Sequence, residues 1–281
     1  VTNMTLGGAD AGNYNVTGGA PSFNGTANIT AAALTITAGA QTKTYDGSTN
    51  VSNASAFTTS GLVGSEAISG VTLAYTDKNA GAGNKTIAVS NATAGANTSL
   101  SNYNITLVDN TASTINQANL TITAGAQTKT YDGTTNVSNT SAFTTSGLVG
   151  SEVISGATLA YTDKNAGAGN KTIAVSNATA GANTSLSNYN VTLVNSTTST
   201  IDKADITAIT GVTLSDKAYD GTLNATFNAS AANFTGKVAG DTLTLSGGTG
   251  GFASKNVGSA INVSVTNMTL GGADAGNYNV T

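Results

Sequence analysis

Short runs of alternating apolar and polar residues recur along the whole chain. Leu34 and Ile36 alternate with threonines, and Leu73 and Tyr75 alternate with small residues in the same manner. An alternation with a period of two is typical of half-buried β-strands, and threonine on the outward face favours a strand over a helix. No stretch places apolar residues at the three- and four-residue spacing of an amphipathic helix. The pattern predicts an all-β protein with essentially no helix.

Turn residues divide this pattern into short segments of similar length. The clusters 46–48, 63–65 and 79–81 combine glycine with aspartate, serine or asparagine, residues that favour tight turns. About six or seven strands are expected in each repeating unit, a number that suits a small sandwich of two sheets. A continuous β-solenoid is the alternative architecture. Its rungs repeat about every 20–30 residues, whereas this chain repeats about every 86, so a tandem array of small β-sandwich modules is favoured.

A long internal repeat sets the predicted boundaries of these modules. The segment Leu34–Gly47 returns unchanged at Leu120–Gly133, and a looser copy stands at Ile206–Gly221. The modules abut without a proline-rich or glycine–serine linker, which favours a stiff string of domains. We expect the C-terminal tail of a preceding divergent module at 1–33, a first β module at 34–119, a near-identical second module at 120–205, and a divergent third module at 206–281 that lacks its last strand.

The two ends of the sequence share a second repeat. Residues 1–17 are identical to residues 265–281, so the chain begins and ends at the same point of a 264-residue super-repeat. The strand that the third module lacks has its counterpart in the opening fragment, around Ala27–Thr30. A cut through a long array of modules explains this arrangement, and we favour that explanation. The alternative is donor-strand pairing, in which residues 18–33 of one chain complete the third module of the next.

Three short motifs recur in the same order in every module. Tyr-Asp-Gly is interpreted as a turn in which glycine supplies a positive φ and aspartate bonds the local backbone. Its tyrosine is expected to plug the end of a strand, with the hydroxyl bonded to a loop, rather than to stack on a sugar. The motif residues are Tyr45, Asp46, Gly47, Tyr131, Asp132, Gly133, Tyr219, Asp220 and Gly221 in Tyr-Asp-Gly, Lys78, Asn79, Lys164, Asn165, Lys255 and Asn256 in Lys-Asn-x-Gly, and Tyr103, Tyr189 and Tyr278 in Asn-Tyr-Asn.

Composition excludes several functional classes. The chain has no Cys, His, Trp or Arg, and its net charge is −4. Disulfides, thiolate metal sites and the commonest general base are therefore absent from its chemistry, and an acidic chain without arginine disfavours a nucleic-acid partner. No run approaches the ~18 apolar residues that span a bilayer. No Ser-x-x-Lys and no phosphate-binding loop occurs, so the sequence predicts no enzyme, no cofactor and no catalytic site.

Two kinds of special site are conceivable, and each has a simpler explanation. Lys78 could form an isopeptide bond if an asparagine or aspartate and an acid were buried with it. The only glutamates are Glu66 and Glu152, one in each twin module, and Asp241 stands at the matching place in the third module. A loop ion pair, or a lysine that caps carbonyl groups, is the simpler explanation and is favoured. Calcium would need several converging carboxylates, whereas the candidate aspartates are scattered singly, so no metal site is predicted; these candidates are Asp10, Asp77, Asp163 and Asp274.

The ordered set of motifs resembles a known family. Tyr-Asp-Gly-Thr-Thr at 131–135, Asp-Lys-Asn-Ala-Gly at 163–167 and Gly-Ala-Asp-Ala-Gly-Asn-Tyr at 272–278 are similar to the YDG-repeat modules of very large bacterial exoproteins of the filamentous-haemagglutinin type. The resemblance covers 34–281 and includes 1–33 as a tail. It implies an exported protein, secreted by the two-partner route or held at a bacterial cell surface. It also implies that the modules are spacers without a catalytic site.

Two functional hypotheses follow from the sequence. The first is a structural stalk or fibre segment of a large extracellular adhesin or matrix protein, of the kind found in biofilms, that acts as a spacer and assembles into filaments. Its partners would be other copies of the chain or neighbouring modules. The second is a repeated weak glycan- or matrix-binding module that acts by avidity. This alternative requires exposed aromatic residues, whereas Phe57, Phe143 and Phe234 are expected in the module cores.

Overall fold

The computed structural model describes residues 5–15 and 25–281. Throughout these residues the protein is all-β, and the only helical segments are 3-10 turns of three residues each, which confirms the fold class predicted from the alternating pattern. These turns are η1 (Ala11–Asn13), η2 (Leu100–Asn102), η3 (Leu186–Asn188) and η4 (Ala275–Asn277).

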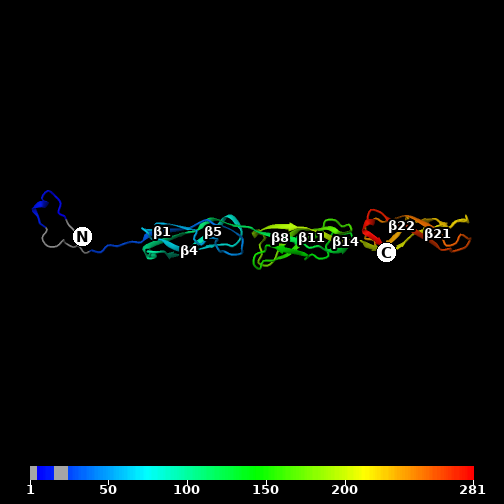
Figure 1. The fold of residues 1–281 in the computed structure, drawn as a ribbon, viewed down its shortest axis with the longest axis horizontal. Helices are drawn as coiled ribbons and strands as arrows, with labels where there is room; N and C mark the ends of the chain where they lie inside the picture. Colours follow the sequence, from blue (N-terminus) through cyan, green and yellow to red (C-terminus); the bar gives the residue numbers. More distant parts are fainter. Residues whose placement is uncertain (1–4, 16–24) are drawn as a thin grey trace. The chain divides into compact units, whose positions relative to one another are not determined.

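The second module shows the complete architecture, a sandwich of two sheets (Figure 1). One sheet has the strand order β10-β8-β13 and the other β11-β12-β14-β9. In the first sheet, β8 is antiparallel to β10 and parallel to β13. In the second, β12 is antiparallel to β11 and to β14, and β14 is parallel to β9. The strands are β8 (Ala118–Ala124), β9 (Thr128–Thr130), β10 (Phe143–Ser146), β11 (Ile154–Tyr161), β12 (Gly167–Ala180), β13 (Tyr189–Val194) and β14 (Ser196–Asp202).

The core of this module comes from the inward positions of alternating strands. Along β8, Leu120 and Ile122 are fully buried while the alternating Thr121 and Thr123 are half-buried. Ile173 on β12 and Ile201 on β14 complete the apolar layer from the opposite sheet. Truncating such a residue to alanine would cost roughly 2–5 kcal/mol, so a thin core of a few aliphatic side chains carries much of the stability.

The first module repeats this plan with the sheet orders β3-β1-β6 and β2-β7-β5-β4. Its strand β1 is antiparallel to β3 and parallel to β6, as β8 is to β10 and β13. The near-identity of the two sequences therefore extends to topology and register. The strands are β1 (Ala32–Ala38), β2 (Thr42–Thr44), β3 (Phe57–Ser60), β4 (Ile68–Tyr75), β5 (Gly81–Ala94), β6 (Tyr103–Val108) and β7 (Asn110–Asn116).

The third module is built from shorter strands. Its main sheet has the order β18-β21-β22, and three two-stranded pairs, β15-β23, β16-β20 and β17-β19, complete it. Within the described chain no strand pairs with the free side of β22, the place that β14 takes beside β12. The strands are β15 (Ala204–Ile206), β16 (Ala208–Thr210), β17 (Thr213–Leu214), β18 (Asn224–Ala225), β19 (Phe227–Asn228), β20 (Asn233–Thr235), β21 (Thr244–Phe252), β22 (Val263–Gly271) and β23 (Tyr278–Val280).

Contacts divide the chain into two compact units whose border does not follow the repeat. One unit comprises 1–41, 50–76 and 83–113. The other comprises Thr42–Thr49, Asp77–Ala82 and Thr114–Thr281. The Tyr45 turn and the Lys78 loop therefore pack with the second module rather than with most of the first. Both segments belong to the second unit.

Candidate functional site: the joint between consecutive modules

The Tyr-Asp-Gly turns share one geometry, held by an aspartate and a lysine. In the second module, Asp132 Oδ1 accepts hydrogen bonds from the N–H of Thr134 (2.9 Å) and from Lys129 Nζ (2.7 Å). Lys129 Nζ also donates to the carbonyl of Thr134 (2.8 Å). Gly133 adopts a φ of +77°, a conformation that side chains disfavour. The same bonds recur in the first and third turns through Lys43 with Asp46 and Lys217 with Asp220.

The turn lysines hold the aspartates in the charged form. Burial alone would raise the pKa of Asp132, but the hydrogen bonds from Lys129 and Thr134 outweigh it, so the pKa lies below its ordinary value. At the third turn, the hydrogen bond from Lys217 lowers the pKa of Asp220 to about 2. The turns are therefore charged and locally braced at neutral pH.

The tyrosine of the first turn finds its hydrogen-bond partner in the second module. Tyr45 is only 3% exposed, and its hydroxyl donates to Glu152 Oε1 at 2.5 Å. Tyr189 donates its hydroxyl to the other oxygen of the same carboxylate and accepts the N–H of Val149 at 2.9 Å. One buried carboxylate thus bridges the recurring tyrosine of one module and the recurring tyrosine of the next.

Burial and the carboxylate together keep these phenols neutral. Burial, reinforced by the hydrogen bond to Glu152 and its charge, raises the pKa of Tyr45 to about 12. The same causes raise the pKa of Tyr189 to about 12. A buried carboxylate that accepts hydrogen bonds from two neutral phenols avoids the cost of an unpaired buried charge.

The second joint repeats this arrangement with aspartate in place of glutamate. Tyr131 is also 3% exposed, and Asp241 Oδ2 accepts its hydroxyl at 2.8 Å and that of Tyr278 at 2.6 Å. The rings of Tyr131 and Tyr278 meet edge to face with centroids 5.5 Å apart. Burial first, and then Asp241, raises the pKa of Tyr131 well above its usual value and that of Tyr278 to about 12.

A pair of asparagines forms a second contact at each joint. Asn188 is 1% exposed; its Oδ1 accepts the N–H of Ala80 at 2.8 Å, and its Nδ2 donates to Asn79 Oδ1 at 3.0 Å. Asn277 makes the equivalent bonds to Ala166 and Asn165, at 2.8 and 3.2 Å. The Lys-Asn-x-Gly and Asn-Tyr-Asn motifs thus meet through their asparagines, and we call this pair of bonds the asparagine clasp.

The backbone of each Tyr-Asp-Gly turn packs closely on a valine of the following module. A Cβ built on Gly47 would lie 3.2 Å from Val149 Cγ1, and one on Gly133 would lie 2.8 Å from Val238 Cγ1. At Gly133, glycine is therefore required twice, for its positive φ and for the space that the next module occupies. All three recurring motifs converge on one interlocking joint.

The three tyrosine turns do not share one environment. Tyr219 is 65% exposed, whereas Tyr45 and Tyr131 are buried. The reason is that the tyrosine does not plug its own module. It packs on the following one, and within the described residues Tyr219 has no such partner. The sequence interpretation expected a tyrosine at a strand end with its hydroxyl bonded to a loop; for Tyr45 that loop, between β10 and β11, belongs to the following module.

The complementary surface of the first module is also open. Tyr103 donates to Glu66 and accepts the N–H of Val63 at 3.0 Å, as Tyr189 does with Glu152 and Val149. The hydrogen bond to Glu66 is the main reason that the pKa of Tyr103 is raised. Val63 and Asn102 are nevertheless exposed, although their counterparts are covered or buried. The tyrosine–carboxylate pair of this surface is thus formed without a covering turn.

The lysines singled out in the sequence have lesser roles. Lys164 Nζ lies 3.9 Å from Asp241 Oδ1, and its side chain is largely exposed. Lys78 and Lys255 are exposed. An isopeptide bond needs its groups buried together, and these lysines are not. The 163–167 loop takes part in two ion pairs, Lys164 with Asp241 and Asp163 with Lys171.

The candidate calcium ligands lie apart from one another. Asp274 Oδ2 accepts the N–H of Thr242 at 2.8 Å, and Asp77 Oδ1 accepts the N–H of Asn79 at 2.9 Å. Asp10 is exposed at the start of η1. Among the residues that the structure describes, no group of three or more acidic side chains could hold a metal ion.

Sequence reasoning missed two sets of residues at the joint. The turn lysines Lys43, Lys129 and Lys217 stand two positions before each tyrosine, a recurrence that the sequence shows plainly. The carboxylates Glu152 and Asp241 were noted only as components of a crosslink. The equivalence of glutamate and aspartate at one place in the repeat was the available signal that this place needs an acid.

The fold and the interlocking joint define the class of protein: a tandem array of small β-sandwich modules. The sequence model of the YDG domain matches the chain three times, at 30–113, 116–200 and 202–281. The chain therefore belongs to the YDG domain family. Neither a search of curated proteins nor one of solved structures found a match to it. In the part of the chain that the structure describes, no helix is long and apolar enough to cross a membrane.

Proposed function

We propose that this chain is a structural spacer, a stiff segment of a stalk or fibre in a large extracellular bacterial adhesin or matrix protein. The observation that carries the proposal is the recurrence of the joint. Two successive Tyr-Asp-Gly turns bind the following module through the same tyrosines, carboxylate and asparagine clasp. Residues that recur at every module contact serve the array rather than a ligand.

The connections between modules support a mechanical role. A single residue, Gln117, separates β7 from β8, and a single residue, Lys203, separates β14 from β15. Short connections restrict the directions that neighbouring domains can take. The clasp and the tyrosine–carboxylate bridge hold the joint at points away from the connection, so bending must break buried hydrogen bonds.

The chemistry of the chain suits an inert extracellular material. It lacks cysteine, histidine and tryptophan, and its recurring polar residues are used for turns and joints. We propose that it is not an enzyme, and we propose a location outside the bacterial cell, secreted or on the surface. The resemblance to exported repeat proteins supports this location.

A repeated glycan-binding role has less support. Such a role would need an aromatic ring exposed at the same place on each module, because stacking on sugars requires an open face. Tyr219 is exposed, but its counterparts Tyr45 and Tyr131 are buried in joints. Phe57, Phe143 and Phe234 are half-buried.

A length series tests the spacer directly. Chains that carry one, two or three further copies of 120–205 would be compared by small-angle X-ray scattering. A spacer predicts that the maximum dimension grows by an equal step with each module. A radius of gyration that grows roughly as the square root of length, as in a flexible chain, would refute it. Micrographs of the cells that make the protein, labelled with an antibody to this chain, would test the extracellular location.

A further inference from the structure

The asparagines of this chain follow a directional pattern. Of 33 asparagines, 24 have a serine or threonine two positions later, whereas 8 have one two positions earlier. Serine and threonine together make up about a quarter of the chain, so composition alone accounts for the second fraction but not for the first. Asn-x-Ser/Thr, with x other than proline, is the acceptor sequence for a sugar on the asparagine side chain.

Neither the internal repeat nor the strands explain this direction. When the copied segments 1–17 and 120–205 are left out, 15 of 21 asparagines have the hydroxyl residue two positions later and 7 have it two positions earlier. The alternation of a strand places residues two positions before and two positions after on the same face, so it would raise both counts equally. The preference for the later position needs another cause.

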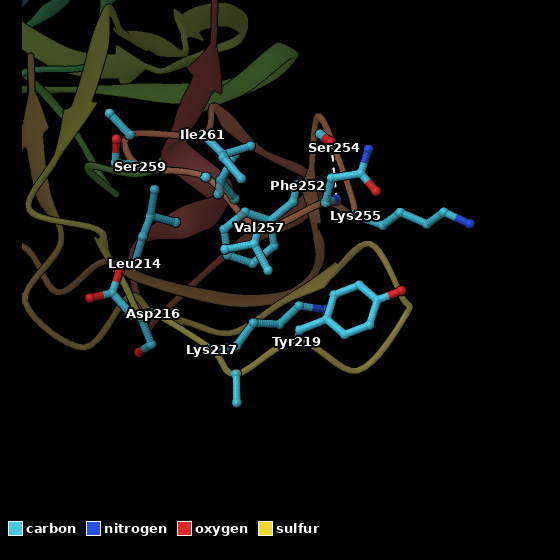
Figure 2. Close-up of a pocket in the computed structure, with 16 residues that line it drawn as sticks. Leu214, Asp216, Lys217, Tyr219, Phe252, Ser254, Lys255, Val257, Ser259 and Ile261 are labelled. Atoms are coloured by element: carbon cyan, nitrogen blue, oxygen red, sulfur yellow. Dashed lines mark hydrogen bonds between the residues drawn. The ribbon is translucent and has the colours of Figure 1, made fainter.

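Both orders have a use in local structure. Figure 2 shows the earlier position in the groove that 214–219 and 252–263 line, where the N–H of Asn256 donates to Ser254 Oγ at 3.1 Å. The later position occurs in a turn at Asn53, whose Oδ1 accepts the N–H of Ser55 at 2.9 Å. Such turns use the oxygen of the asparagine amide and need no hydroxyl on the later residue. Turn geometry therefore explains the asparagine but not the serine or threonine.

Exposure separates the two groups of asparagines. The structure describes 22 of the 24 that have a following hydroxyl residue, and all 22 are exposed. The other nine include the buried Asn188 and Asn277 and the half-buried Asn110. Seven of the nine belong to the Lys-Asn-x-Gly and Asn-Tyr-Asn motifs, whose asparagines form the clasp in the two joints. The acceptor sequence is thus present on the open surface and missing from the clasp.

Two acceptor positions are kept in the divergent third module although their other residues have changed. Asn-Ala-Thr at Asn91 and Asn177 returns as Asn-Met-Thr at Asn267, and Asn-Val-Ser at Asn50 and Asn136 returns as Asn-Ala-Thr at Asn224. The middle residue varies and serine is exchanged for threonine, which are the changes that an acceptor sequence tolerates.

The first of these positions projects from its sheet. Asn91, Asn177 and Asn267 have positive φ values of 49°, 47° and 57°, and all three are exposed. At Asn91 and Asn177 the pairing of the long strand with its neighbour skips the asparagine, which forms a β-bulge. A bulge turns its side chain away from the regular ladder. Asparagine tolerates this conformation, but the conformation does not require the threonine that follows.

We propose that this chain carries N-linked sugars on its exposed Asn-x-Ser/Thr sequences, foremost at Asn91, Asn177 and Asn267, and that the asparagines of the clasp stay unmodified. The co-reactant is a sugar activated at C1 by a diphosphate group. The bond between the amide nitrogen and C1 forms, the C1–O bond breaks, the diphosphate leaves with the electron pair, and one amide proton passes to a base of the transferring enzyme. This proposal goes beyond the spacer function and does not rest on it.

Sugars at these positions would protect the edges of the sheets. β6 and β13 are edge strands, and each carries an exposed acceptor, Asn104 or Asn190, followed by an exposed leucine, Leu107 or Leu193. Edge strands can pair with other chains, and charged side chains commonly prevent this. Only 9% of this chain is charged. A bulky hydrophilic sugar blocks the approach of another strand without a charge.

Peptide mass spectrometry of the chain purified from the cells that make it tests the proposal. We expect peptides that contain Asn91, Asn177 or Asn267 to carry the additional mass of one or more sugar residues, and fragmentation should place that mass on the asparagine. Unmodified asparagines throughout the chain would overturn the proposal, as would a sugar on the hydroxyl of Thr93 in place of Asn91.

Three variants at one site separate an acceptor sequence from a structural motif. Asn91→Gln and Thr93→Ala should each abolish the modification of this peptide, whereas Thr93→Ser should keep it because the hydroxyl is retained. Asn177 in the same chain is the internal control and should stay modified in all three variants. A sugar on Asn91 that persists in Thr93→Ala would contradict the proposal.

The twin modules supply a matched variant that gains a site. Asp109 and Asn195 occupy the same place, are both exposed, and are each followed two positions later by a threonine. Their Oδ1 atoms accept the N–H of Val89 and of Val175 at 3.0 and 3.1 Å, so Asp109→Asn should fold as the parent does. We expect this variant to gain a sugar at position 109, as Asn195 carries one. A modified Asn195 without a gain at 109 would overturn the proposal, and neither result changes the length series that tests the spacer.

Discussion

The rings of Tyr45 and Tyr189 meet edge to face, with centroids 5.6 Å apart and an interplanar angle of 79°, although one belongs to a turn of the first module and the other to β13 of the second. Edge-to-face pairs add roughly 0.5–1.5 kcal/mol beyond the area that they bury. Both hydroxyls end on Glu152. A recurring tyrosine of one module therefore packs against a recurring tyrosine of the next and shares its hydrogen-bond acceptor. This relationship supports four predictions.

The twin modules allow the bridging carboxylate to be tested against its own copy. Glu152→Ala removes the acceptor of two buried phenols, and hydrogen bonds to a charged group contribute roughly 1.5–3 kcal/mol each. We expect a loss of about 3 kcal/mol in the free energy of urea unfolding. Glu66→Ala removes the acceptor of Tyr103 alone and should cost clearly less than Glu152→Ala. If both variants lose the same free energy of unfolding, the contact of Glu152 with Tyr45 across the joint contributes nothing to stability.

A second matched pair lies in the glycines of the turns. Gly133 and Gly221 have nearly the same φ, +77° and +74°, but a Cβ at Gly133 meets Val238 at 2.8 Å while one at Gly221 meets nothing within 4 Å. Both alanine variants should lose about 1 kcal/mol from the left-handed conformation. Gly133→Ala should lose a further 1–3 kcal/mol from the clash.

Thermal unfolding of the two variants measures this difference. The lower melting temperature should belong to Gly133→Ala, and the double variant Gly133→Ala/Val238→Ala should recover part of the loss because it removes the clashing methyl groups. If Gly221→Ala is as damaging as Gly133→Ala, the close approach of the valine has no energetic consequence.

The sequence predicts the strands and the turns well because their causes are local. Alternation of apolar residues locates β1 and β8, and the chemistry of aspartate and glycine locates the turns at Asp46 and Asp132. A local pattern of this kind needs no knowledge of the partner module. The two-sheet sandwich follows from the number of strands and from the long period of the repeat.

The joint is harder to predict for a physical reason. A repeat shows that Tyr45, Tyr131 and Tyr219 recur, but it does not show whether each packs in its own module or in the next. A shift of contacts by one whole module leaves the sequence pattern unchanged. The hydrogen bonds of Tyr45 to Glu152 and of Tyr131 to Asp241 reveal the shift. The turn lysines, in contrast, recur two positions before each tyrosine, so the sequence already contains their signal.

The asparagine clasp yields a third prediction with a local readout. Asn188 accepts the N–H of Ala80, so Asn188→Ala should speed hydrogen exchange at Ala80 and destabilise the protein by about 2 kcal/mol, the cost of unsatisfied buried groups. The exposed counterpart Asn102 is the control, and Asn102→Ala should change stability by less than about 0.5 kcal/mol. An unchanged exchange rate at Ala80 in the Asn188 variant would contradict the clasp.

The last prediction concerns the response of the joint to alkaline pH. Burial and the carboxylate raise the pKa of Tyr45 and of Tyr189 from the ordinary value of 10.0 to about 12. A raised pKa in the folded state means that the neutral phenol is the stabilised form. Its contribution is therefore complete below pH 10 and is lost as the pH rises through 12. We expect the urea midpoint to fall steeply across this window.

The variant Tyr45→Phe separates the joint from other groups that titrate at the same pH. Phenylalanine has no proton to lose, so this variant should be less stable than the parent at pH 9 but should lose less stability between pH 10 and 12. Groups common to both proteins cancel in the comparison. Part of the phenolate absorbance of the folded parent should appear only near pH 12, where Tyr45 and Tyr189 ionise. A single step near pH 10, with parallel urea curves for the two proteins, would show that the tyrosine–carboxylate bridge does not hold the modules together.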